Sequence, residues 1–260
     1  MTSSPKPFST LRFAGILNSP CAVSPSHQPH QIIRRQHKEL SSSQSGGLFL
    51  HLQYAHLRYP FFMQIPTLEG TSIRLEPLTL DHLHALEAIA FDPTIWRYML
   101  ASVHTPQDLD LWVEAALNEQ ASGTTLPWVT IKKSHDATPD QLVGSTRFLD
   151  LDLTHRTTEL GHTWLAASAR GTRINTEAKL LQLTYAFETL NLNRVAFKTH
   201  HENLQSQNAM KAIGCVYEGT FRNHYIMPDG SHRHSVWFSI VHEDWPTTKA
   251  LLQSRLNTPR

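Results

Sequence analysis

The stretch TTELGHTWLAASARGTRINTEA, residues 157–178, decides how this chain is expected to fold. Its first part, TTELGHTWL, predicts a β-strand, AASAR a short loop, and GTRINTEA the opening of a long apolar helix. Backbone N–H groups in the first turn of a helix have no partner within the helix and carry the positive end of its dipole. Such a loop can hold a pyrophosphate, with Gly171 allowing close approach, although many loops place a glycine before a helix without binding anything.

Outward from this stretch, the spacing of apolar residues predicts a succession of strands and helices. Strands are expected at 71–78, 127–132, 141–149, 157–165, 194–199 and 234–241, and helices at 80–90, 105–117, 172–190 and 203–213. The clearest helix start is TPQD at 105–108, with a capping Thr105, a proline at the first helical position and an acid at the third. With one further strand between the helix at 203–213 and the strand at 234–241, the predicted order is β-α-α-β-β-β-α-β-α-β-β. This order favours an α+β fold, in which a mixed, mostly antiparallel sheet has helices on both faces.

The chain divides at about residue 62. Residues 1–62 hold six basic side chains and one acidic one, a balance of +5, which leaves −4 for the remainder. The segment is rich in Ser, Pro and His, and SSSQSGG at 41–47 resembles a flexible linker, so we expect disorder at 1–62 and one folded domain at 63–260. Three origins are open for it: an organelle transit peptide, a dispensable tail, or translated sequence upstream of a true start at Met63, which we favour.

Charge and cysteine content narrow the function further. The chain has 260 residues, 40% of them hydrophobic, and a formal net charge of +1, so no general affinity for nucleic acid is expected. Cys21 and Cys215 cannot form a disulfide framework, and no apolar run is long enough to span a bilayer. We expect a soluble protein of a reducing compartment, the cytoplasm or, if residues 1–62 are a transit segment, an organelle.

Signature motifs of several common enzyme classes are absent. The sequence contains no GxGxxG, GxxxxGK[ST], GxSxG or HExxH, which argues against dinucleotide and nucleotide-triphosphate binding, serine hydrolases and zinc proteases. Histidine is abundant, at 17 residues, and occurs in close pairs at His82/His84, His200/His201 and His232/His234. Because no cluster of Cys, Asp or Glu lies at a matching interval, we expect no metal site.

Several motifs together resemble one family. They are IRLEPL at 73–78, ELGHTWL at 159–165, RGTRINTEA at 170–178, NLQS at 203–206 and GCVYEG at 214–219. This set, which covers roughly residues 72–245, resembles the GNAT superfamily of acyl-CoA-dependent N-acetyltransferases, and within it the branch of ribosomal-protein N-terminal acetyltransferases. The resemblance implies direct transfer of an acetyl group from acetyl-CoA to a primary amine, without a metal.

The resemblance also implies which residues hold the acetyl-CoA. The family pattern Q/R-x-x-G-x-G/A falls on the loop residues Arg170, Gly171, Thr172, Arg173, Ile174 and Asn175. Arg173 and Asn175 stand where the family usually has glycine or alanine, so each would either crowd the pyrophosphate or add a donor to it. Trp164 and Leu165, at the end of the preceding strand, and Asn203 complete the implied binding set.

Three residues are candidates for the proton transfers. Glu159 is the first choice for the base that takes a proton from the ammonium, and His162 is the second. On a regular strand these two side chains face opposite sides, but a bulge would change the facing. Ser206, with Tyr217 and Tyr225 as substitutes, is the candidate acid for the departing thiolate. The plainer interpretations are a salt bridge for Glu159, a packed ring for His162 and helix capping by Asn203.

Two other classes of function remain open at this stage. The chain could be a non-catalytic module of the same fold that binds acyl-CoA or a partner, or a histidine-rich metal-binding regulator. The acceptor is equally open, because amino acids, polyamines, aminoglycosides and protein N-termini all carry a cationic amine that the −4 balance of residues 63–260 would attract. We expect a monomer or a homodimer.

Overall fold

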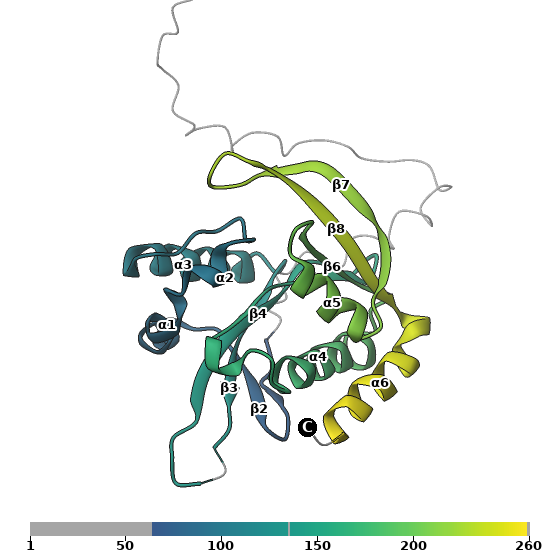
Figure 1. The fold of residues 1–260 in the computed structure, drawn as a ribbon. Helices are drawn as coiled ribbons and strands as arrows, with labels where there is room; N and C mark the ends of the chain where they lie inside the picture. Colours follow the sequence, from purple (N-terminus) through teal and green to yellow (C-terminus); the bar gives the residue numbers. More distant parts are fainter. Residues whose placement is uncertain (1–63, 135, 259–260) are drawn as a thin grey trace, which may run out of the picture. The chain divides into compact units, whose positions relative to one another are not determined.

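The computed structural model describes residues 64–134 and 136–258. The expected disorder of residues 1–62 lies outside the described residues. The described chain forms one mixed sheet with helices on both faces, as the order of predicted elements indicated (Figure 1).

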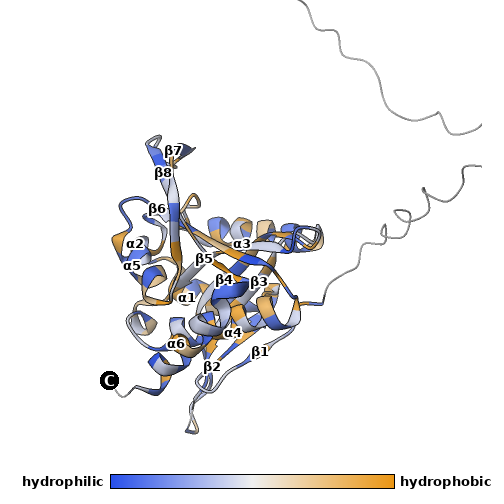
Figure 2. Ribbon diagram, turned by 90° about the vertical axis from the view of Figure 1, so that its right-hand side faces the viewer, coloured by the Kyte–Doolittle hydropathy of each residue, from blue (hydrophilic) through white to orange (hydrophobic). Residues whose placement is uncertain are grey.

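The sheet has eight strands in the order β1-β2-β3-β4-β5-β6-β8-β7. Their bounds are Leu68–Glu69 (β1), Ile73–Pro77 (β2), Leu126–Lys132 (β3), Gln141–Asp152 (β4), Thr157–Leu165 (β5), Arg194–His200 (β6), Val216–Ile226 (β7) and His232–Val241 (β8). Neighbouring strands pair antiparallel except β5 and β6, which run parallel. The long β7–β8 hairpin extends beyond the rest of the sheet in both views (Figures 1 and 2).

Helices cover both faces of the sheet. Their bounds are Leu83–Ala90 (α1), Pro93–Trp96 (α2), Pro106–Ala121 (α3), Ile174–Thr184 (α4), Leu204–Ala212 (α5) and Trp245–Asn257 (α6). One core cluster joins α1, α2 and α3 to Val129, Leu142 and Trp164 of the sheet. The other joins α4, α5 and α6 to the opposite face, through residues such as Leu160 and Phe197. The two clusters give the sheet an α3 side and an α4 side.

Differences from the predicted elements have local causes. The expected helix 172–190 begins at Ile174, because residues 171–173 form the turn before it, and its last part widens into a π-helix at Tyr185–Thr189. Helix α6 was missed because its sequence, WPTTKALLQSRLN, has little amphipathic pattern and buries only Trp245, Thr248 and Leu252. The helix start at Thr105 is confirmed, with a complete capping box to Asp108. No helix among the described residues is long and apolar enough to cross a membrane.

Candidate active site

The parallel pair at the centre of the sheet comes apart after three residues. Residues 157–159 of β5 pair with residues 194–196 of β6. Beyond that point β6 keeps its pairing with β8 through to His200, whereas β5 continues to Leu165 paired only with β4. In the described part of the chain, one backbone edge of residues 160–165 is therefore left without a ladder partner. Unpaired N–H and C=O groups on such an edge are ready to bind an extended ligand or to support a developing oxyanion.

A β-bulge follows at the same place. Arg147 of β4 lies opposite Gly161, and Ser145 lies opposite Trp164, so β5 has one residue more than β4 between these pairs. His162 takes up the extra length in the left-handed region, with φ of 46°. The ring of His162 stacks on Trp112 of α3, with ring centroids 6.4 Å apart. The bulge thus places Glu159 and His162 on the α3 side together, which a regular strand would not do.

Glu159 is buried beside a lysine. The residue is 5% exposed, and its Oε2 lies 2.7 Å from Nζ of Lys198 on β6. A Cβ at Gly161 would come within 3.0 Å of Glu159 Oε1, so the glycine leaves room for the carboxylate. Burial raises the pKa of Glu159 above its usual range, and the charge of Lys198 lowers it only in part. A carboxylate with a raised pKa is a better proton acceptor than an exposed one.

His162 is a poor base in this setting. Burial, together with the nearby positive charges of Arg147, Lys198 and Arg233, lowers the pKa of His162 to about 3. An imidazole with such a pKa stays neutral at physiological pH and holds a proton too weakly to take one from an ammonium group. The opposite directions of these two pKa shifts therefore favour Glu159 over His162 as the proton acceptor.

Sequence reasoning missed the cations around these two residues. Lys198 and Arg233 alternate with the core residues Phe197 and Val236, which places both cations on the α3 side of the sheet, and Arg147 lies over the Trp112 ring, 3.9 Å from its centroid. The available signal was weak, because RVAFKTH at 194–200 contains other polar residues besides Lys198, which alternates with the core residues Val195 and Phe197. Burial lowers the pKa of Arg147 to about 10.

The loop before α4 has the backbone of an anion site. Gly171 has φ of 70°, in the region that favours glycine, and a Cβ built there meets no atom within 4 Å. The hydroxyl of Thr172 donates to the Ala169 carbonyl at 2.6 Å and accepts from the Ile174 N–H at 3.3 Å. The open space at Gly171 fits a phosphate group approaching the first turn of α4.

The loop arginines are engaged elsewhere. Arg170 donates from Nη2 to Asp92 Oδ2 at 2.9 Å, from Nη1 to Thr94 Oγ1 at 2.7 Å and from Nε to the Leu165 carbonyl at 2.8 Å, so its side chain fixes the loop to the start of α2. Arg173 donates to the Thr258 carbonyl. A hollow of about 470 Å³ lies at the loop, lined by Ser72, Lys132, Lys133, Ser168, Thr172, Arg173 and Ile174. Lys133 Nζ lies 2.5 Å from Glu69 Oε2, whereas the exposed Lys132 and the start of α4 suit the phosphates of a nucleotide.

The remaining predicted residues lie on β5, in α4 and at the start of α5. Asn203 caps α5, because its Oδ1 accepts a hydrogen bond from the Ser206 N–H at 3.1 Å, which confirms the capping interpretation. Ser206 is half-buried in the first turn of α5, directly after β6. Trp164 belongs to an aromatic cluster with Trp96 and Trp112, at centroid distances of 5.8 and 6.1 Å. Leu165 packs on the α4 side, and Asn175 is half-buried in the first turn of α4.

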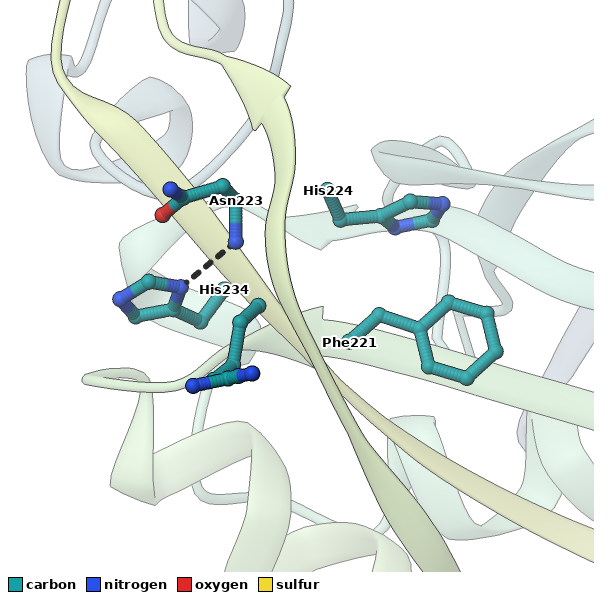
Figure 3. A pocket seen from close by; sticks show the side chains of 5 residues that line it. Phe221, Asn223, His224 and His234 are labelled. Atoms are coloured by element: carbon teal, nitrogen blue, oxygen red, sulfur yellow. Dashed lines mark hydrogen bonds between the residues drawn. The ribbon is translucent and has the colours of Figure 1, made fainter.

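The β7–β8 hairpin carries a second hollow, of about 820 Å³, lined by Phe221, Arg222, Asn223, His224 and His234. Figure 3 shows Asn223 and His234 on one side of the strand, where the Asn223 N–H donates to His234 Nδ1 at 2.8 Å, and Phe221 and His224 on the other. Phe221 and His224 both contact Trp237, at 5.4 and 5.9 Å between centroids. The Trp237 ring centroid lies 5.2 Å from Nζ of Lys198, the lysine that pairs with Glu159. No group of three or more metal-ligating side chains suits a metal ion within the described ranges.

Comparison with known proteins identifies relatives of this chain. Residues 72–216 match the acetyltransferase (GNAT) domain family. YdaF of Bacillus subtilis (strain 168), to which ribosomal N-acetyltransferase activity is attributed, is 34% identical over 108 residues. That match covers 42% of this chain, which thereby spans 58% of the length of YdaF.

Solved structures give the same result. A protein of T. thermophilus assigned as an acetyltransferase has 34% identity and a TM-score of 0.66, over 73% of this chain and 96% of its own. RimJ of Mycobacterium smegmatis, solved in complex with CoA-disulfide, has a TM-score of 0.61 over 73% of this chain and 91% of its own. Because RimJ is only 21% identical to this chain, the match shows a similar fold and nothing more.

Proposed function

The chain belongs to the acetyltransferase (GNAT) family, and from this premise we propose that it transfers an acetyl group from acetyl-CoA to a primary amine of a small molecule or a protein N-terminus. The observation that carries the proposal is the separation of β5 from β6 beside the buried carboxylate of Glu159, with the loop before α4 at the end of the same strand. RimJ, which shares this fold, was solved with a CoA compound.

In the proposed reaction, each part of the site has one task. The turn at residues 171–174 binds the pyrophosphate of acetyl-CoA through backbone N–H groups, and the open edge of β5 holds the arm of the cofactor. Glu159 accepts a proton from the ammonium of the acceptor. The free amine then attacks the thioester carbonyl, so that a C–N bond forms and the C–S bond breaks. A backbone N–H of β5 supports the oxyanion, and the sulfur of CoA leaves with a proton delivered by Ser206 or a tyrosine, which recovers a proton from the attacking nitrogen as the amide forms.

Turnover with a panel of amines tests the proposal. Purified protein is mixed with acetyl-CoA and, in turn, amino acids, polyamines, aminoglycosides and short peptides, and the free CoA thiol is measured over time. We expect thiol release that depends on the acceptor, with the acetylated amine identified by its mass. Release of CoA without an acetylated amine would contradict amine transfer.

The alternative is a GNAT module that binds acyl-CoA without catalysis. It is favoured by one observation, the non-glycine residues Arg173 and Asn175 in the loop. Tight binding of acetyl-CoA with no turnover of any amine would support it. We further propose that the protein acts on acetyl-CoA and an amine, without a metal or nucleic acid, as a monomer or homodimer. Its proposed location is the cytoplasm, or an organelle if residues 1–62 are a transit segment.

A further inference from the structure

Buried positive charge exceeds buried negative charge around Glu159. Arg147 is 2% exposed and Arg233 6%, and the side chain of Lys198 is 15% exposed. All three act on the same neighbour, because their charges lower the pKa of His162. Burying a charge is costly unless an opposite charge is close, so each cation in this group needs a partner.

Two of the three cations have a carboxylate. Lys198 Nζ lies 2.7 Å from Glu159 Oε2. Arg147 Nη1 lies 3.9 Å from Glu119 Oε2, and the Arg147 guanidinium also covers the Trp112 ring. Arg233 forms no ion pair with any described residue and donates to neutral oxygens, the Tyr98 carbonyl at 3.1 Å and Ser235 Oγ at 3.1 Å. A guanidinium has five N–H donors and prefers a carboxylate.

Arg233 also lies beside the proposed base. Arg233 and Lys198 share the ring of Tyr225, because the Arg233 Cζ lies 5.9 Å and the Lys198 Nζ 5.5 Å from its centroid. The charge of Glu159 acts on Arg233 and partly offsets the effect of burial, which lowers the pKa of Arg233. An anion bound to Arg233 would therefore lie close to the amine from which Glu159 takes a proton.

We propose that Arg233, with Lys198 next to it, binds a carboxylate that the acceptor carries close to its amine. The acceptor class is then an amine with a neighbouring carboxylate, either an amino acid with a free α-carboxyl or a peptide N-terminus followed by an acidic residue. This inference rests on the proposed function. The carboxylate of the acceptor would pair with the Arg233 guanidinium. It would also explain why the site contains cations although the reacting group of the acceptor is a cationic ammonium.

A purely structural role for Arg233 is the competing explanation. Its hydrogen bond to the Tyr98 carbonyl joins β8 to the segment before α3, and loss of this bond would disturb the site for every acceptor. A binding role instead predicts loss only for acceptors that carry a carboxylate. Arg255 provides a matched control, because its Nη1 donates to the Ala212 carbonyl at 3.0 Å on the exposed surface of α6.

The test compares matched acceptors with wild type, Arg233→Gln, Arg233→Lys and Arg255→Gln. The acceptor pairs are alanine and alaninamide, and the amidated tripeptides Ala-Asp-Ala and Ala-Asn-Ala. In one of the two pairs, we expect wild type to use the acceptor with the carboxylate better than its neutral partner, with kcat/KM higher by about 10- to 100-fold. Arg233→Gln should abolish this preference through KM, Arg233→Lys should restore part of it, and Arg255→Gln should leave it intact. The preferred pair distinguishes an α-carboxyl from an acidic side chain.

Binding separates failure of this inference from failure of the proposed function. The N-acetylated forms of the same four compounds are titrated into each protein by calorimetry, in the presence of CoA. Preferential binding of the carboxylate compounds, lost in Arg233→Gln, would support the inference even if no amine is acetylated. Equal handling of acidic and neutral compounds by wild type, or an equal loss for both in Arg233→Gln, would overturn the inference and leave amine acetylation standing.

Discussion

Glu159 holds its carboxylate where little water reaches it and where a lysine is in contact. Burial favours the protonated form, whereas Lys198, at 2.7 Å, favours the charged form, and the balance is a raised pKa. This balance suits a group that accepts a proton and then releases it in each turnover. His162, only three residues along the same strand, is kept neutral by burial and by cations. The two residues thus differ in environment although the bulge puts them on one side.

The first prediction concerns Glu159→Gln, which keeps the shape and removes the basicity of the side chain. We expect kcat to fall about 10²- to 10⁴-fold with acetyl-CoA affinity unchanged. Because the pKa of Glu159 is raised, the wild-type rate should fall with decreasing pH already above the usual carboxyl range, and this acid limb should vanish in the variant. Steady-state kinetics across pH measures both effects.

Glu188→Gln is the matched control, because Glu188 Oε1 also lies 2.7 Å from a lysine, Lys249, but outside the site. This variant should keep normal turnover and the acid limb. If Glu159→Gln stays active and His162→Ala does not, the imidazole is the base. If both stay active, the amine arrives neutral and the protein acts mainly by positioning the reactants.

At the scale of elements, α4 carries a buried lysine that pairs with no carboxylate in the described part of the chain. Lys179 is 5% exposed, and its Nζ donates to Thr163 Oγ1 at 3.0 Å, Gln182 Oε1 at 3.2 Å and Thr146 Oγ1 at 3.4 Å. These bonds join α4 to β4 and β5, next to the open edge of β5. Burial lowers the pKa of Lys179 to about 7.

The second prediction is a pH dependence of stability that comes from Lys179. Its pKa is about 7 in the folded protein and 10.5 in an ordinary setting, so the unfolded chain binds more protons between these values. The free energy of unfolding should therefore rise with pH in this window and fall as pH approaches 7. Lys179→Met removes this contribution, so wild type should gain about 2–3 kcal/mol relative to the variant between about pH 7.5 and about pH 9.5.

Chemical denaturation at the two pH values measures the difference. Lys249→Met, which removes a surface lysine of α6, should behave as wild type does. A gap between wild type and Lys179→Met that does not change with pH would show that Lys179 keeps its ordinary pKa in the folded protein.

The third prediction separates binding from backbone strain in the loop before α4. Gly171 and Gly123 have φ of 70° and 79°, and a Cβ at either meets no atom within 4 Å. Valine at either position should cost about 1–2 kcal/mol of stability, because a β-branched residue is strained there. Only Gly171→Val should also weaken acetyl-CoA binding, by about 1–3 kcal/mol, since the new side chain fills the space proposed for the pyrophosphate.

Denaturation curves and acetyl-CoA titrations of the two variants give the comparison. Equal affinity in Gly171→Val and Gly123→Val would remove this loop from the acetyl-CoA site.

At the scale of the whole molecule, the sequence could predict helix starts and turns, because these features depend on residues close together along the chain. The helix start at Thr105 and the turn at Gly171 are local, because their hydrogen bonds and dihedral angles involve residues a few positions apart. Glu159 and His162 were candidates because they lie on the strand that leads into this loop. The bulge that gives them a common side was anticipated only as a possibility, since it depends on the register of β5 against β4.

Contacts between segments that lie far apart in the sequence could not be predicted from it. Arg170 was expected to face the phosphates from its place in the motif, yet its guanidinium binds Asp92, which lies 78 positions earlier. Lys198 and Arg233 come together with Glu159 only because β6 pairs with β8 after leaving β5. Such partners are fixed by strand order and register, which apolar spacing alone does not determine.

The last prediction concerns the division of the chain at Met63. Among the described residues, contacts with the core begin at Ile65, which packs against it, and at Pro66, whose carbonyl accepts the Trp128 Nε1–H at 2.9 Å. A chain truncated to Met63–Arg260 keeps both contacts, so we expect the Tm and the acetyl-CoA affinity of the full chain. A chain that starts at Gly70 loses β1 and leaves the buried Trp128 N–H unpaired, at a cost of about 1–3 kcal/mol, so its Tm should fall. Thermal denaturation and acetyl-CoA titration of the three chains measure these differences. Residues 1–62 take part in the fold if Met63–Arg260 is insoluble or binds acetyl-CoA about tenfold more weakly. A tenfold weaker affinity corresponds to a loss of about 1.4 kcal/mol.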